Sequence, residues 1–130
     1  MKIIATTGIR SEYYILHPVI KKLASRGHEV KLILSGAHLS DWHGSSLKQI
    51  ENDGFEIADK IDSLFYTDRK TQRIKGIGSL VTGIAQCVER EKPDLLLYVG
   101  DREEGIATAL VGNYMDILFA HLSGGDSVWG

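Results

Sequence analysis

The run 95–99 and the residues after it constrain the fold of this chain more than any other feature. Five residues, Leu-Leu-Leu-Tyr-Val, stop at Gly100, four charged residues follow at once, and a helical pattern then begins. In a parallel α/β sheet this order is typical of a buried strand leading into a helix at its carboxyl end, where ligands bind. Asp101, the first charged residue, is therefore a candidate for chemistry. The same aspartate could instead cap the helix that follows.

The succession of strand, glycine and helix recurs along the whole chain. Short β-rich runs predict strands at 3–6, 30–34, 55–61, 95–99 and 117–122. Apolar residues at helical spacing predict helices at 11–26, 46–53, 71–91 and 103–115. This alternation predicts an α/β fold with a doubly wound, mostly parallel, Rossmann-like sheet.

Some local residues modify this prediction. Ser11 could cap the first helix, and Pro18 inside its pattern predicts a kink or a late start. Gly76, Gly78 and Gly83 are expected to loosen the first half of the long helix. The polar stretch 37–46 is predicted to be a loop.

The composition is ordinary for one globular domain, and it excludes several functions. Hydrophobic residues make up 43% and charged residues 25% of the 130 positions. A net charge of −2 gives no long-range attraction to nucleic acid or an anionic membrane. We find no export signal and no apolar run long enough to span a membrane, so the expected location is the cytoplasm. The one cysteine, Cys87, is predicted to fill the core.

The segment after the first strand has the features of an anion site. Gly8 permits a tight turn, the helix that starts near Ser11 offers N–H groups, and Arg10 can add positive charge next to a phosphate. The segment has neither the three-glycine dinucleotide fingerprint nor a P-loop. The arginine could equally be a solvated side chain at a helix start.

The segment after the second strand contains two histidines. His38 and His43 flank Asp41, but loop residues at this spacing say little about a metal, and no third ligand is evident. We expect no metal here. A substrate-facing loop is the favoured interpretation, and a plain surface loop is the alternative.

Two aspartates follow the fourth and fifth strands. In a parallel sheet these strand ends share one edge, so Asp101 and Asp126 could converge in a cleft. Paired carboxylates suit proton abstraction and donation, because burial and mutual repulsion separate their pKa values. His121 lies nearby in sequence, either as a core histidine or as a ligand contact.

Taken together, these strand ends resemble a known family. The segments that carry the resemblance are 7–13, 36–40, 50–55, 92–102 and 120–126. They are similar to the N-terminal part of the UDP-N-acetylglucosamine 2-epimerases, and more closely to the hydrolysing branch of sialic and nonulosonic acid synthesis. The resemblance covers essentially the whole chain, in order and at the right spacing.

The resemblance implies a fold, a reaction and a set of roles. Two Rossmann-like domains would form a glycosyltransferase-B-like arrangement with the active site between them. UDP would be eliminated to give a 2-acetamidoglucal, and water would then add with inversion at C2, giving N-acetylmannosamine or a related 2-acetamido sugar. No metal or redox cofactor is implied. Asp101 and Asp126 would be catalytic, and the substrate-binding residues would be Gly8, Arg10, Glu12, His38, Arg102 and His121, with Arg10 at the diphosphate.

The chain departs from the family pattern in two respects. Asp126 stands where the family has Glu, and Ser123 where relatives often have His or Glu. Either the substrate differs, for example a diacetamido sugar, or the assignment of Asp126 is wrong. A carboxylate one methylene shorter keeps the charge but need not reach the same proton, and near-attack geometry is sensitive to about an ångström. Residues 1–130 are also expected to be an incomplete N-terminal domain without its nucleotide-binding partner domain. We expect this piece to be inactive alone, and association through the domain's helices would make it a homo-oligomer.

Two other functions remain open on the sequence. One is the acceptor-binding subunit of a two-component glycosyltransferase, which should carry an apolar or basic membrane-facing patch near the strand ends, and the sequence shows little of one. The other is a non-catalytic nucleotide- or sugar-binding module. In such a module Asp101→Asn would leave ligand affinity nearly intact, and no reaction would depend on the residue.

Overall fold

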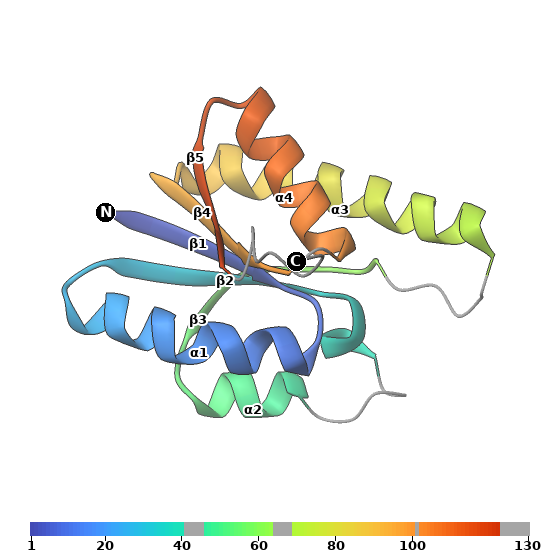
Figure 1. Cartoon of the computed structure of the whole chain (residues 1–130). Coiled ribbons are helices and arrows are strands. Elements are labelled where there is room, and N and C mark those ends of the chain that lie inside the picture. The colour runs from blue at the N-terminus through green and yellow to red at the C-terminus, as the bar shows by residue number, and fades with distance from the viewer. Residues whose placement is uncertain (41–45, 64–68, 101, 123–130) are drawn as a thin grey trace, which may run out of the picture.

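The computed structural model describes residues 1–40, 46–63, 69–100 and 102–122 and has an α/β architecture (Figure 1). Its strands are β1 (Lys2–Thr7), β2 (Glu29–Ser35), β3 (Glu56–Ile61), β4 (Leu95–Val99) and β5 (Leu118–Leu122). Its helices are α1 (Arg10–Ser25), the 3₁₀ turn η1 (Gly36–Leu39), α2 (Ser46–Asn52), α3 (Lys70–Glu91) and α4 (Glu103–Tyr114).

The described strands form one parallel sheet in the order β3-β2-β1-β4-β5. The chain moves outward from β1 through β2 to β3, then returns to place β4 on the other side of β1. This order confirms the predicted doubly wound, Rossmann-like fold. All described strands point the same way, so their carboxyl ends lie along one edge, and the order reverses between β1 and β4.

Helices cover both faces of the sheet (Figure 1). Successive residues of a strand point to opposite faces, so β1 places Ile3 and Ala5 in one core and Ile4 in the other. The first core packs against α1 and α2, and the second against α3 and α4. Cys87 is fully buried in the second core, and burial raises the pKa of its thiol to about 11. The prediction that it fills the core is confirmed.

The start of α1 differs from the sequence-based expectation. Ser11 does not cap the helix: the N-cap is Ile9, in extended conformation and without a side-chain cap. Glu12 instead reaches back to the preceding turn, where its Oε1 accepts a hydrogen bond from the N–H of Gly8 at 2.9 Å. The helix runs through Pro18 from Arg10, so the expected late start is also wrong. A proline at this position leaves a carbonyl one turn earlier, at the exposed Tyr14, where water can bind it.

Two further elements differ from expectation. Helix α3 is continuous despite its glycines, and a Cβ on Gly83 would lie 2.6 Å from Cδ1 of Ile61, so this glycine lets the helix approach the sheet closely. The predicted loop begins with η1, which ends with a hydrogen bond from the N–H of Ser40 to the carbonyl of Ala37 and contacts the β1–α1 turn through the N–H of His38, bonded to the carbonyl of Gly8. Among the helices that the structure describes, none is long and apolar enough to cross a membrane.

Candidate functional site at the carboxyl edge of the sheet

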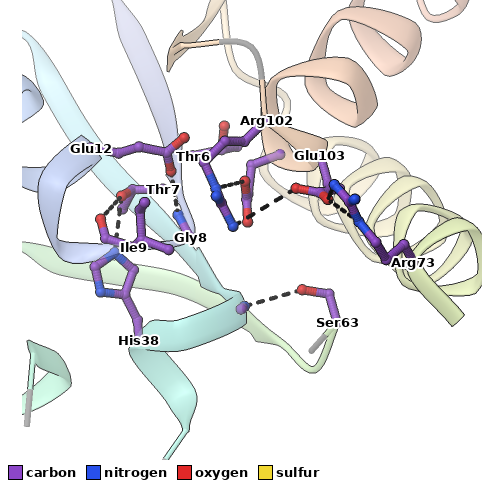
Figure 2. A network of polar contacts seen from close by, with 12 residues as sticks. Thr6, Thr7, Gly8, Ile9, Glu12, His38, Ser63, Arg73, Arg102 and Glu103 are labelled. Atoms are coloured by element: carbon purple, nitrogen blue, oxygen red, sulfur yellow. Dashed lines mark hydrogen bonds and ion pairs between the residues drawn. The ribbon is translucent and has the colours of Figure 1, made fainter. Parts of the chain in front are cut away.

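The candidate site lies where the strand order reverses, at the carboxyl ends of β1, β2 and β4. Each of these strands is followed by a glycine, namely Gly8, Gly36 and Gly100. Gly36 and Gly100 have φ values of 56° and 74°, which favour glycine. Figure 2 shows the polar side chains that gather around this edge from α1, η1, α3 and α4.

The turn after β1 is enclosed by two glutamates. Glu12 binds the N–H of Gly8, so that N–H is already occupied and is not offered to an outside anion. On the other side, a Cβ on Gly8 would lie 1.9 Å from Oε1 of Glu104, and a Cβ on Gly36 would lie 3.2 Å from the same atom. The glycines that follow β1 and β2 therefore leave the space that the Glu104 carboxyl group fills.

Both glutamates are buried and incompletely hydrogen-bonded. Their exposed fractions are 5% for Glu12 and 4% for Glu104. Within the described part of the chain, the Oε2 atom of each has no hydrogen-bond partner. Burial raises the pKa of both carboxyl groups, and the charge of Glu12 adds to the effect at Glu104, whose pKa rises to about 7. A carboxylic acid with this pKa can exchange a proton at neutral pH.

Arg102 brings positive charge to the rim of this pair. It is the N-cap of α4, its side chain is 49% exposed, and its Nε lies 3.8 Å from Oε2 of Glu104. Its Nη2 lies 3.9 Å from Oε2 of Glu103, and the other carboxylate oxygen of Glu103, Oε1, accepts a hydrogen bond of 2.9 Å from Arg73 (Figure 2). Burial alone would raise the pKa of Glu103, but these arginines and a backbone hydrogen bond hold it below its usual value.

His38 is an internal, neutral histidine. Its Nε2 lies 3.0 Å from the hydroxyl of Thr7 and its Nδ1 lies 2.9 Å from the hydroxyl of Ser46. Burial, and then the charge of Arg10, lower its pKa to about 4. The ring thus ties η1 and α2 to the end of β1. Arg10 itself is exposed at the first position of α1. Substrate contact by either residue stays a prediction.

His121 supports the turn after β4. Its Nε2 donates a hydrogen bond of 2.6 Å to the carbonyl of Gly100, and its ring stacks on Tyr98 with centroids 4.5 Å apart. The N–H of Gly100 in turn bonds to the carbonyl of Leu122. These contacts fix the backbone immediately before position 101. They favour the interpretation of His121 as a core histidine, and contact of His121 with a ligand stays a prediction.

Several predicted positions lie outside the described residues: Asp41, His43, Asp101, Ser123 and Asp126. Their catalytic or ligand roles stay predictions. Gly100 and Arg102, on either side of Asp101, are described and lie at the carboxyl edge. In the described ranges, no group of three or more His, Cys, Asp or Glu side chains could hold a metal ion.

The sequence-based prediction missed Glu104. A signal was present, because positions 104, 107, 108 and 111 form one buried stripe of α4, and a glutamate on such a stripe is unusual. The hydroxyl of Thr108 on this stripe donates to the carbonyl of Glu104 at 2.6 Å and lies 2.8 Å from the hydroxyl of Thr6. The stripe therefore anchors α4 to β1 by polar contacts beneath the site.

Known proteins resemble this chain over nearly its whole length. Residues 21–128 match the family model of UDP-N-acetylglucosamine 2-epimerase. The chain is 32% identical to the UDP-N,N'-diacetylbacillosamine 2-epimerase (hydrolyzing) of Legionella pneumophila, over 96% of this chain and 33% of that protein. It is also 32% identical to the GDP/UDP-N,N'-diacetylbacillosamine 2-epimerase (hydrolyzing) of Campylobacter jejuni, over 99% and 34%. The chain thus spans about a third of the length of these relatives.

Solved structures share the fold. The UDP-GlcNAc 2-epimerase of Neisseria meningitidis bound to UDP-GlcNAc superposes with a TM-score of 0.77 at 21% identity, covering 100% of this chain and 34% of that one. The UDP-GlcNAc 2-epimerase of Methanocaldococcus jannaschii, in complex with UDP-GlcNAc and UDP, gives a TM-score of 0.77 at 24% identity, covering 93% and 32%.

Proposed function

Because the chain belongs to the UDP-N-acetylglucosamine 2-epimerase family, we propose that it is the N-terminal portion of a hydrolysing UDP-sugar 2-epimerase. The main support is the glycine-lined strand edge at the reversal point, with Arg10 and Arg102 on its rim. Both relatives at 32% identity are named as hydrolysing enzymes. In the whole protein a second Rossmann-like domain would close over this edge in a glycosyltransferase-B-like arrangement.

The proposed reaction has two steps. In the first, a base removes the proton from C2 of the sugar while the bond between C1 and the UDP oxygen breaks, leaving a glucal. In the second, water adds its oxygen to C1 and a proton returns to C2 from the opposite face. Asp101 and Asp126 are the proposed acid–base pair, on the resemblance and on their positions after β4 and β5 in sequence.

The described residues divide into binding and positioning roles. Arg10 and Arg102 are exposed cations at the starts of α1 and α4, suited to the diphosphate. Glu12, Gly8 and His38 are buried with internal partners, so we propose that they shape the β1–α1 turn. His121 holds Gly100 in place beside the catalytic position.

The proposed substrate is UDP-N-acetylglucosamine or a UDP-diacetamido sugar. The second is supported by the names of the two relatives and by Asp126, a shorter acid than the family Glu. The assay is UDP release from each nucleotide sugar by the full-length protein. We expect Asp101→Asn to lower kcat by orders of magnitude with a modest change in substrate affinity. Unchanged turnover in that variant would contradict the assignment, and the 130-residue chain alone should release no UDP.

One observation favours the rival glycosyltransferase subunit. A hollow between the starts of α3 and α4 is lined by three basic side chains, three isoleucines and one glutamate: Lys70, Arg73, Arg102, Ile74, Ile77, Ile106 and Glu103. Ile74 is 66% exposed there. Such a patch could lie on an anionic membrane. Cosedimentation with anionic vesicles that is lost in Ile74→Glu, together with UDP release only in the presence of an acceptor, would support this rival over the epimerase.

We also propose that two copies of the protein associate through α3 and α4. Leu110 and Tyr114 lie on one exposed stripe of α4, and beside them is a hollow of about 410 Å³ lined also by Val81, Ala85 and Met115, with no charged residue. An uncharged stripe of this kind can pair with its own copy across a two-fold axis. Sedimentation of the full-length protein should show a dimer that Tyr114→Glu dissociates. A monomeric wild type would contradict this association, and the stripe would then be covered by another part of the same protein. We place the enzyme in the cytoplasm, which cell fractionation would test.

A further inference from the structure

The two buried glutamates come from helices on opposite faces of the sheet. Glu12 extends from α1 and Glu104 from α4, and they approach each other above the end of β1. The Glu104 Oε1 atom fills the gap left by Gly8 and Gly36. The Glu12 Oε2 atom lies near Gly100, where a Cβ would be 3.7 Å away. The three glycines therefore enclose one pair of carboxyl groups.

Among the described residues, the charged groups around this pair include more carboxylates than cations. Of the described charged groups near Glu104, Glu12 comes from α1, and Arg102 and Glu103 from α4. Arg73 of α3 is engaged with Glu103 at 2.9 Å. In the part of the chain that the structure describes, this leaves Arg102 to compensate the pair, and its Nη2 also lies 3.9 Å from Oε2 of Glu103. Like charges in a buried site favour retention of a proton.

The separation between Arg102 and Glu104 fits a pair that is not fully ionised. Their Nε and Oε2 atoms are 3.8 Å apart, about an ångström longer than a charge-assisted hydrogen bond. The same Oε2 atom has no hydrogen-bond partner in the described residues. A small movement of the half-exposed arginine would close this gap.

We propose that Glu12 and Glu104 hold one proton between them and are positioning residues for Arg102. When the pair loses that proton, Glu104 draws the Arg102 guanidinium inward and away from the phosphate side of the rim. When the proton is retained, Arg102 extends toward the ligand. The part of this inference that concerns a phosphate rests on the proposed function, whereas the coupling between the three side chains does not.

The coupling is tested by NMR titration of the protein labelled at the glutamate carboxyl carbons and the arginine Nε atoms. We expect the Glu104 signal to titrate near pH 7 and the Arg102 Nε signal to move with the same midpoint. Arg73, bound to Glu103, is the matched control and should not respond there. Glu12→Gln should lower the Glu104 midpoint by about one pH unit or more. An unchanged Glu104 midpoint in Glu12→Gln, or an Arg102 Nε signal that does not move with the Glu104 titration, overturns the inference.

Two variants extend the test. Glu104→Gln should abolish the response of Arg102 near neutral pH. If that variant does not fold, Arg102→Gln, a change at a half-exposed position, should raise the Glu104 midpoint, because a neighbouring positive charge is lost. A Glu104 midpoint that stays in place or falls in Arg102→Gln contradicts the proposal.

UDP serves as the probe for the phosphate. In the full-length protein, its dissociation constant should rise between pH 5.5 and pH 8.5 by severalfold more in the wild type than in Glu104→Gln, since the ionisation of UDP itself affects both equally. If the dissociation constant of UDP rises by the same factor between these pH values in both proteins, the pair does not position Arg102 for the phosphate. If UDP does not bind at any pH, the proposed function fails and the NMR titration alone decides the inference.

Discussion

The Oε1 atom of Glu104 lies 1.9 Å from the point that the Cβ of a larger residue at Gly8 would occupy. A side chain of α4, the helix that follows β4, thus fills the space beside the turn that follows β1. This contact joins the segments on either side of the point where the strand order reverses. Gly8 is not one of the glycines with a positive φ. The lack of space for a Cβ, and not the backbone conformation, therefore requires glycine here.

Gly8→Ala should therefore destabilise the protein by about 1–3 kcal/mol, the usual cost of overpacking. Urea unfolding measures this cost. In a Glu104→Ala background the cost should become much smaller, because the clash is removed. Gly78→Ala is the matched control: its Cβ would meet open space in α3, so that change should stabilise the protein by about 0.5–1 kcal/mol. Equal costs of Gly8→Ala in both backgrounds would rule out the contact.

Glu104 should make the folded state less stable as pH rises. Its folded pKa, about 7, lies above the ordinary value of 4.5, so the folded state binds the proton more tightly. The free energy of unfolding should fall between pH 4.5 and 7, by up to roughly 3 kcal/mol from this group, and level off above. Urea unfolding across this range should show the decline in the wild type relative to Glu104→Gln. Parallel curves for the two proteins would contradict it.

His38 should act in the opposite direction. Its folded pKa, about 4, lies below the ordinary 6.5, so the folded state favours the neutral ring and loses stability as pH falls through that window. The two effects overlap between pH 4.5 and 6.5 and partly offset each other in the wild type. His38→Gln should therefore reveal the decline due to Glu104, and Glu104→Gln the rise due to His38. If the ring signals of His38 titrate near pH 6.5 in the folded protein, His38 is not a buried, neutral histidine.

Cys87 should be inert in the folded protein. Its thiol is fully buried and its pKa is about 11. Alkylation by iodoacetamide at pH 8 should be slower than in the urea-unfolded chain by about a hundredfold or more, since the thiolate reacts and access is blocked. Mass spectrometry of the alkylated chain measures the rate. Comparable rates in the two states would place Cys87 outside the core.

The sheet could be predicted from the sequence because its signals are local. The strands are short apolar runs, as in 95–99, or mix apolar and polar residues, as in 55–61, and the long helices have apolar residues at helical spacing, as in 71–91. The burial of Cys87 in the core could be predicted from the same spacing. The cap at Ser11 was wrong because the chain satisfies the turn differently: Glu12 binds the N–H of Gly8, and the helix starts at Arg10.

The details of the site depend on contacts between distant segments. The partners of His38 are Thr7, 31 positions away, and Ser46, and no local pattern specifies such a pairing. Glu104 reads in the sequence as one of four charged residues after a strand. Its position on the buried stripe of α4 is a local signal, but the space that its carboxyl group fills beside Gly8 and Gly36 follows only from the strand order.

The most direct test of the central claim, that this strand edge belongs to a UDP-sugar 2-epimerase, is the reaction of the full-length protein in D₂O. Elimination followed by addition of water must exchange the C2 hydrogen with solvent. Mass spectrometry of the released 2-acetamido sugar should therefore show one carbon-bound deuterium, located at C2 by NMR, and Asp101→Asn should form little product. UDP release with the original hydrogen retained at C2 would contradict the account.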